Sequence, residues 1–180
     1  MKHTILFLIA FTASTVFGQI HLESIGAAPG AAEFSGNSPA TTGLYTGLYT
    51  EFKIKGVDGV FFRLQFMECK DFNFIVSSDI MTHYYPYIYG FGLTIGEAQP
   101  INESLSLIYG AGFLTLRNRI YDDIDNWAYG VEAHAGILAI VSEKENHIWQ
   151  IGVEGAYGQT FTTNTPGYLT VYAECRYVFK

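Results

Sequence analysis

His134 and Glu132 are the residues whose types and spacing come nearest to those of a catalytic pair. They lie two positions apart in NWAYGVEAHAGILAIV, so both side chains point to the same face if this segment is a strand. An imidazole beside a carboxylate could act as a general base with its orienting group. However, His134 is followed by Ala135 and Gly136, and the segment contains no Ser that could serve as a nucleophile. The pattern favours a buried, hydrogen-bonded histidine, and we expect no catalytic residues.

A second group of candidate ligands lies in RNRIYDDIDN, where Asp122, Asp123 and Asp125 stand near Arg117 and Arg119. Clustered carboxylates could hold Ca²⁺, or bridge through divalent ions to an anionic surface glycolipid. The segment lacks the Gly and the closing Glu of a twelve-residue calcium loop, which favours a solvated acidic loop. The chain contains no GxSxG, no HExxH and no Gly-rich phosphate loop. We therefore expect neither a metal site nor a cofactor.

The segments that would position these side chains alternate between apolar and polar residues. In GYLTVYAECRYVFK, one face is apolar from Leu169 to Phe179, and the other carries Glu174 and Arg176. Six further segments alternate in the same way: GLYTGLYTEFKIKG, GVFFRLQFMECK, YYPYIYGFGLTIGE, ESLSLIYGAGFLT, NWAYGVEAHAGILAIV and HIWQIGVEGAYG. An eighth segment, QIHLESIGA, alternates more weakly. Apolar residues recur at every second position and not at the helical spacing of three and four, so the pattern predicts β-strands.

The connections between these segments alternate in length. VDG, EAQPINE and SEKEN have the composition of tight turns, whereas the other connections are longer: SGNSPATT, DFNFIVSSDIMTHY, RNRIYDDIDN and QTFTTNTPG. Short turns at one end, long loops at the other and an even strand number are typical of outer-membrane barrels. The sequence therefore predicts an all-β fold, an eight-stranded antiparallel up-and-down transmembrane β-barrel.

The N-terminus and the composition agree with a membrane location. Residues 1–18, MKHTILFLIAFTASTVFG, have the order of a secretory signal peptide, which leaves residues 19–180 as the outer-membrane β-barrel domain. Charged residues make up 15% of the chain, below the figure of about a quarter that is usual for soluble domains. The net charge of −7 argues against nucleic acid as a partner, because phosphate binding needs clustered cations.

In such a barrel the apolar faces meet lipid and the opposite faces line the lumen. The charged residues on the inward faces nearly balance one another: Glu51, Lys53, Arg63, Glu132, His134, Glu154, Glu174 and Arg176. Charges shut away from water need partners, so we expect a salt-bridge network that plugs a narrow lumen. We expect the three long cationic side chains to reach over inward glycines on the opposite wall. Alternatively, those glycines leave a cavity for a small ligand or a thin water path.

Aromatic residues near the strand ends would form girdles at the two membrane interfaces: Tyr85, Trp127, Trp149, Tyr177 and Phe179. Further aromatic residues lie in or beside the long loops, where they would suit contact with a macromolecule or the lipopolysaccharide layer: Phe72, Phe74, Tyr84 and Phe161. Cys69 falls on an inward face and Cys175 on an outward one, so a disulfide between them is not expected.

The signal peptide, the alternating strands and the closing Tyr177-Val178-Phe179 resemble those of the small eight-stranded outer-membrane barrels of the OmpA/OmpX type. The resemblance covers the mature chain through its pattern rather than through a specific motif. It implies a Gram-negative cell-envelope protein with a porin-like fold, located in the outer membrane and in contact with its lipid and lipopolysaccharide. It also implies recognition by the barrel-assembly machinery through the C-terminal strand, although here Lys180 follows the terminal aromatic residue.

The resemblance leaves the activity open, because that family includes adhesins, structural tethers and a few lipid-modifying enzymes. We expect a non-enzymatic protein of structural or adhesion type, with a plugged lumen and with extracellular loops that contact a macromolecular partner. Two alternatives remain. One is a narrow small-solute channel or lumenal small-ligand binder, and the other is a lipid-A-modifying enzyme that uses His134. The first strand is hard to locate because the residues around Pro29 alternate weakly.

Overall fold

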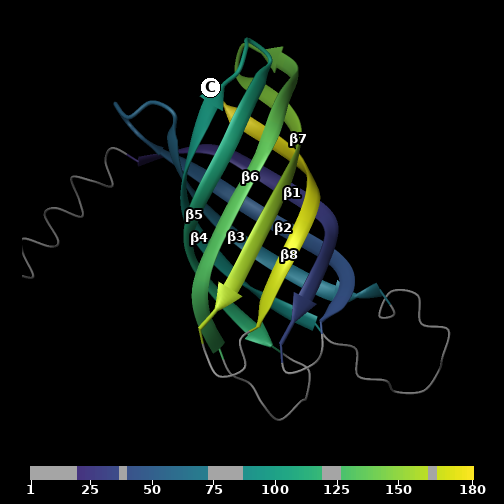
Figure 1. The fold of residues 1–180 in the computed structure, drawn as a ribbon. Coiled ribbons are helices and arrows are strands. Elements are labelled where there is room, and N and C mark those ends of the chain that lie inside the picture. Colours follow the sequence, from purple (N-terminus) through teal and green to yellow (C-terminus); the bar gives the residue numbers. More distant parts are fainter. Residues whose placement is uncertain (1–19, 37–39, 73–86, 119–126, 162–165) are drawn as a thin grey trace, which may run out of the picture.

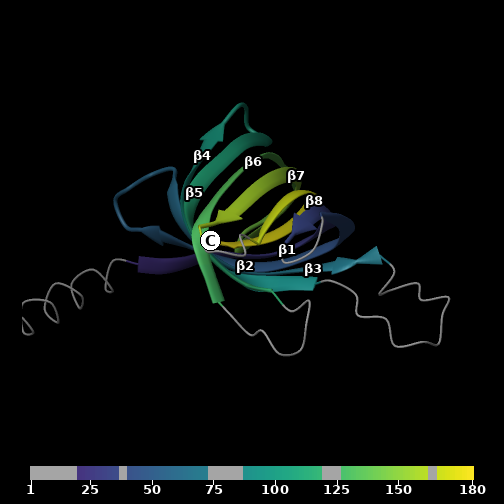
Figure 2. The ribbon, with the colours of Figure 1, turned by 60° about the horizontal axis from the view of Figure 1, so that its bottom comes forward.

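A computed structural model describes residues 20–36, 40–72, 87–118, 127–161 and 166–180. These residues form eight strands: β1 (Ile20–Ser35), β2 (Thr41–Ile54), β3 (Val60–Asp71), β4 (Tyr87–Pro100), β5 (Leu105–Asn118), β6 (Trp127–Lys144), β7 (His147–Thr160) and β8 (Gly167–Phe179). Each strand pairs with the next along the chain, and β8 pairs with β1, so the sheet closes on itself (Figures 1 and 2). All eight pairings are antiparallel. The predicted eight-stranded up-and-down barrel is confirmed.

The strand register determines how wide the barrel is. We followed the register from each residue to its partner on the next strand, starting at Glu97 of β4. One full circuit of the barrel ends at Tyr87 of the same strand, an offset of ten residues (97 minus 87). With about 3.3 Å between residues along a strand and about 4.8 Å between strands, this offset corresponds to a tilt of about 40° and a radius of about 8 Å. A barrel of this width has room for side chains or one small ligand, but not for a porin-sized channel.

The two ends of the barrel differ in their connections. At the short-turn end, which lies toward the top of Figure 1, the strands are linked by residues 55–59, 101–104 and 145–146. At the loop end they are linked by residues 36–40, 72–86, 119–126 and 161–166. The link predicted at SGNSPATT is thus shorter than expected, because β1 continues to Ser35. In the first short turn, Gly56 and Gly59 have φ angles of 87° and 79°, a conformation that glycine adopts without strain.

β1 is longer than the sequence pattern predicted, because it runs through Pro29. The side chain of Pro29 points outward, its backbone pairs with Thr46 of β2, and the register with β8 skips it. A proline lacks the N–H that the second ladder would need. The register of β1 also shifts between Leu22 and Ser24, as at a β-bulge. These two irregularities explain why the alternation of this strand was weak in the sequence.

The outer surface of the barrel is apolar across its middle. Large exposed hydrophobic side chains come from every strand, among them Ile25, Leu48, Leu64, Leu93, Phe113, Val131, Val153 and Val171. In hydrocarbon, every backbone polar group must be paired within the protein, and a closed sheet achieves this because it has no edges. Among the described residues there is no helix that is long and apolar enough to cross a membrane.

Aromatic rings lie at both ends of this apolar band. At the loop end, the ring of Trp127 packs against those of Tyr89 and Phe91, with centroids 6.1 and 6.3 Å apart. At the short-turn end, the ring of Tyr177 packs against those of Trp149 and Phe179, with centroids 5.1 and 5.0 Å apart. Tyr85, the remaining residue of the predicted girdles, lies outside the described residues. An apolar band between two aromatic girdles is the surface of a transmembrane barrel.

Candidate functional site

An ion-pair network centred on Arg63 of β3 crosses the lumen. The Arg63 guanidinium lies 3.0 Å from Glu51 Oε1, 2.7 Å from Glu154 Oε1 and 3.5 Å from Glu174 Oε1, and these carboxylates come from β2, β7 and β8. It also lies over the ring of Tyr49, 4.3 Å from the centroid, a cation–π arrangement. Arg63 is 1% exposed. A charge buried to this degree is tolerated only when several partners replace its water.

His134 of β6 belongs to this network and does not form the pair with Glu132 that its sequence spacing allows. Its Nδ1 lies 2.7 Å from Glu154 Oε1, and its Nε2 lies 3.3 Å from the hydroxyl of Thr94. Glu132 instead accepts a hydrogen bond of 2.6 Å from the side-chain amide of Gln65. Within the described part of the chain, no Ser is hydrogen-bonded to His134. The hydroxyl that does lie beside the imidazole is that of Thr94, and it is only 1% exposed, so this contact is buried away from any substrate.

Of the other two predicted lumenal cations, Arg176 joins this network and Lys53 does not. Arg176 forms an ion pair with Glu51, which also pairs with Arg63, and donates to the hydroxyl of Ser24 at 3.2 Å. Lys53 does not join the central network, because its Nζ lies 2.6 Å from Glu23 and its side chain remains 32% exposed. Glu23 was missed in the sequence because it lies at the bulge in β1, and a bulge breaks the alternation that identifies inward residues.

The long cationic side chains do not lie nearest to the glycines that face the lumen, which differs from the prediction. The nearest atoms belong to neighbouring backbone, to rings and, at Gly92, to the carboxylate of Glu132. A Cβ at Gly96 would lie 2.5 Å from the ring of Phe61, and a Cβ at Gly110 would lie 2.5 Å from Nε2 of His134. Gly96 and Gly110 therefore make room for rings that fill the lumen beside the network.

Gly96→Ala should lower the free energy of unfolding by about 1–3 kcal/mol, the usual cost of overpacking a filled interior. Its new Cβ would lie 2.5 Å from the ring of Phe61 and 2.7 Å from the backbone oxygen of Tyr109. Gly155→Ala is the matched control, since its nearest neighbour is the backbone oxygen of Thr170 at 3.6 Å. Urea unfolding of both variants in one detergent measures the difference. Equal midpoints would show that this part of the lumen is loosely packed.

Apolar side chains fill the lumen between the Arg63 network and the loop end. The cluster consists of Ala28, Ala32, Phe34, Tyr45, Met67, Cys69, Ile88, Leu114, Leu116, Ala156, Tyr168 and Tyr172. The ring of Tyr45 stacks on that of Tyr172 with centroids 5.1 Å apart. Cys69 is buried here, Cys175 is exposed on the outer surface, and neither forms a disulfide. The lumen is therefore filled by a layer of paired charges and by an apolar layer on the loop side of it.

The lumen contains a cavity of about 200 Å³ at the short-turn end. Its lining is both charged and apolar: Glu23, Glu51, Lys53, Phe61, Ala98, Ser106, Leu138, Ile148, Gln150, Arg176 and Val178. Within the described ranges, no group of three or more His, Cys, Asp or Glu side chains is placed to hold a metal ion.

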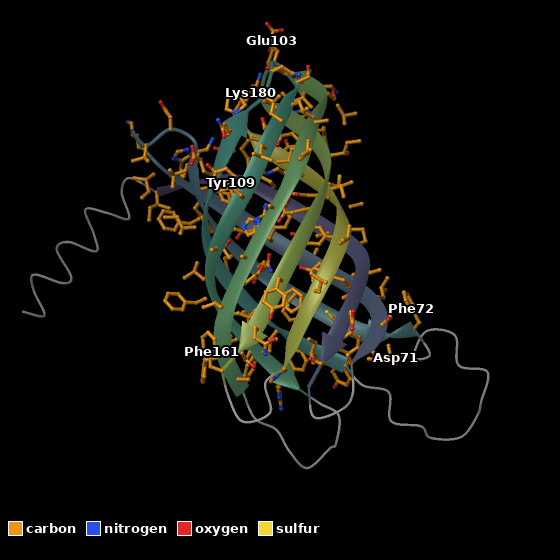
Figure 3. All side chains as sticks on the ribbon, in the orientation of Figure 1. Asp71, Phe72, Glu103, Tyr109, Phe161 and Lys180 are labelled. Carbon is orange, nitrogen blue, oxygen red and sulfur yellow. The ribbon has the colours of Figure 1, made fainter. Side chains whose placement is uncertain are left out.

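Only part of the predicted loop surface lies in the described residues. Phe72 and Phe161 are exposed at the loop end (Figure 3). Arg117, at the same end of β5, lies over the rings of Tyr89 and Trp127, 5.6 and 5.9 Å from their centroids. The other predicted loop residues lie outside the described ranges: Phe74, Tyr84, Arg119, Asp122, Asp123 and Asp125.

Solved structures of small outer-membrane barrels are similar to this chain. Neisserial surface protein A is 14% identical, with 85% of this chain and 94% of that protein covered and a TM-score of 0.61. Ail of Yersinia pestis, in complex with the heparin analogue sucrose octasulfate, is 14% identical over 87% and 99% of the two chains, with a TM-score of 0.48. The N-terminal β-barrel domain of Pseudomonas aeruginosa OprF is 12% identical over 87% and 99%, with a TM-score of 0.46. No family model and no curated protein matches the chain.

The fold and the outer surface together define the class of protein. The chain is a small eight-stranded transmembrane β-barrel, and its fold is shared with Neisserial surface protein A. The predicted outer-membrane localisation agrees with this likeness. At 14% identity the likeness concerns the fold, and the activity has to be inferred from the residues of this chain.

Proposed function

We propose that the protein is a non-enzymatic integral outer-membrane protein whose barrel is an anchor with a closed lumen. The observation that carries this proposal is the Arg63 network, which joins carboxylates of three other strands across the barrel. The buried apolar cluster fills the lumen on the loop side of that network. The side chains of both layers are buried, which supports a lumen closed to solutes, and His134 is held by its partners within the first layer.

The loop end is the proposed interaction surface. In barrels of this type the short turns face the periplasm and the longer loops face outward, so Phe72 and Phe161 would be exposed to the exterior. Exposed aromatic rings favour contact with another macromolecule or with lipopolysaccharide. Beside them, Lys70 and Glu68 form a partly exposed ion pair of 2.8 Å on the outer face of β3, at the level where polar headgroups would begin.

The proposed route to the membrane uses both ends of the chain. Residues 1–18 would act as the signal peptide, and β8 would be the strand that the barrel-assembly machinery recognises. Support for the second role comes from Tyr177 and Phe179, whose rings pack together at the end of β8.

Recordings in planar bilayers test the closed lumen. We expect the inserted wild-type protein to give no conductance steps, because paired charges and apolar side chains fill the lumen. A general-diffusion porin in the same bilayer serves as the positive control. Insertion is verified separately by gel migration that shifts on boiling. Steps that change in amplitude in Glu154→Gln would contradict the proposal and favour a narrow channel.

A second candidate function, binding of a small ligand in the lumen, is favoured by the 200 Å³ cavity at the short-turn end. Arg176 and Lys53 contribute cationic groups to its lining, although each is already paired with a carboxylate. A rise in unfolding temperature with inorganic phosphate, lost in Lys53→Met, would favour this function over a purely structural lumen.

A further inference from the structure

Two depressions on the membrane-facing surface join into one groove. The first lies over β5, β6 and β7, has a volume of about 420 Å³ and is lined by Ala111, Gly112, Phe113, Val131, Glu132, Ala133 and Tyr157. The second extends it toward the short-turn end, has a volume of about 410 Å³ and is lined by Val60, Ile95, Gly96, Glu97, Tyr109, Gly110 and Ala111. Ala111 belongs to both linings, so the two depressions adjoin at this residue of β5, and together they are called the groove below.

The groove is hollow because its floor consists of small residues between large ones. Ala111 pairs with Ala133 across β5 and β6, and both are outward-facing positions on the lipid side of the sheet. The exposed rings of Phe113 and Tyr157 stand at one end of this floor, and Tyr109 stands at the other. The result is an apolar channel on the outside of the barrel, with room for a flexible hydrocarbon chain.

One carboxylate, that of Glu97, lies at the short-turn end of this groove. Glu97 is exposed on the outward face of β4, three residues before that strand ends at Pro100. The hydroxyl of Tyr109 donates to Glu97 Oε2 at 2.6 Å. Figure 3 shows Tyr109 between the turn that carries Glu103 and the middle of the barrel. Glu97 therefore lies where the apolar band gives way to the headgroups at the short-turn end.

Glu97 has no cationic partner in the described part of the chain, where the ion pairs are made by other carboxylates. An exposed carboxylate at the edge of the apolar band gains an ion pair from any cationic group that reaches it. The one neutral hydrogen bond from Tyr109 leaves the charge itself unbalanced. A cation supplied from the membrane would balance it.

We propose that this groove binds a phospholipid whose headgroup ends in a primary ammonium. The inference rests on the membrane location proposed above. The ammonium would lie against Glu97, and one acyl chain would lie along Ala111 and Ala133 toward the middle of the bilayer. A primary ammonium donates hydrogen bonds to a carboxylate, whereas a quaternary ammonium cannot. A headgroup that is only anionic would be repelled by the same carboxylate.

Lipid retention by the mature protein tests this site. The protein is inserted into vesicles that contain phosphatidylethanolamine, phosphatidylcholine and phosphatidylglycerol with identical acyl chains, then extracted in mild detergent and weighed by native mass spectrometry. We expect phosphatidylethanolamine to be retained about two- to fivefold more than phosphatidylglycerol, the range that one exposed ion pair supplies. Glu97→Gln should abolish that preference, and Ala111→Leu, which fills the floor, should reduce retention of all three lipids.

Two variants outside the groove are matched controls. Glu143→Gln removes an exposed acidic residue that is already paired with Lys180 at 2.8 Å, and Ala27→Leu enlarges a small residue of β1. Both should retain lipid as the wild type does. Equal retention of the three lipids, or an unchanged preference in Glu97→Gln, would overturn the lipid inference but leave the membrane location standing.

A protein that fails to insert, judged by the gel shift on boiling, would remove the membrane location and the inference together. A dimer mass that disappears in Ala111→Leu would assign the groove to a second copy of the chain and would also overturn the lipid proposal.

Discussion

Arg63→Met should lower the free energy of unfolding by about 3–5 kcal/mol, because it removes the shared partner of buried charges. Without the guanidinium, Glu154 loses its contact of 2.7 Å and Glu174 its contact of 3.5 Å, while both side chains stay buried in the lumen. Methionine preserves much of the side-chain volume, so the loss reports on charge pairing rather than on a cavity.

Urea unfolding in detergent, followed by the fluorescence of the two tryptophans, measures this loss. Lys53→Met is the control, since the pair of Lys53 with Glu23 is partly exposed and should contribute less than about 1 kcal/mol. Glu174→Gln in the Arg63→Met background should recover part of the stability, because Arg63 is the cation that faces Glu174 and the second substitution removes the charge left without it. Similar losses in Arg63→Met and Lys53→Met would show that the central network does not hold the lumen together.

Leu48→Arg should lower the free energy of unfolding from phospholipid vesicles by about 2–4 kcal/mol, the cost of a cation on the lipid face near the bilayer midplane. Leu48 is 62% exposed and lies in the middle of β2 (Thr41–Ile54). Thr42→Arg is the matched control on the same strand and face. It lies at the loop end, where headgroups and water would solvate the charge, and it should cost no more than about 1 kcal/mol.

The comparison of these two arginine variants tests directly whether the outer surface of the barrel faces lipid. An outer surface that faced water would solvate an arginine equally at both positions, and Leu48→Arg would then be nearly neutral. That outcome would contradict the transmembrane assignment, whatever the result for Arg63.

The face on which each side chain lies could be predicted from the sequence for seven strands. In β3, the sequence predicts Arg63 and Gln65 inside and Leu64 outside, and the structure places them so. A strand has a period of two, so the sorting is local and needs no knowledge of neighbouring strands. β1 was the exception, because Pro29 and the bulge beside Glu23 interrupt its alternation.

The partners of each side chain could not be predicted in the same way. Glu51 lies opposite Arg63 in the β2–β3 register, a neighbour that a hairpin implies. Glu154 and Glu174 reach Arg63 from β7 and β8, and that meeting depends on how far the strands are staggered around the closed barrel. Likewise, the spacing of Glu132 and His134 allowed a pair and favoured a buried, hydrogen-bonded histidine, but it did not identify Glu154 as the partner of His134.

The sequence by itself therefore determined that this chain forms strands, that the expected number is eight, and, for seven of them, which side chains face the lumen and which face outward, because each of these follows from local alternation and turn composition. Only the tertiary structure decided which charges meet, which rings cover the glycines and where small outward residues align into a groove. Those contacts depend on closure of the sheet with an offset of ten residues (97 minus 87). That offset sums the register of every pair of strands, so no single segment contains it.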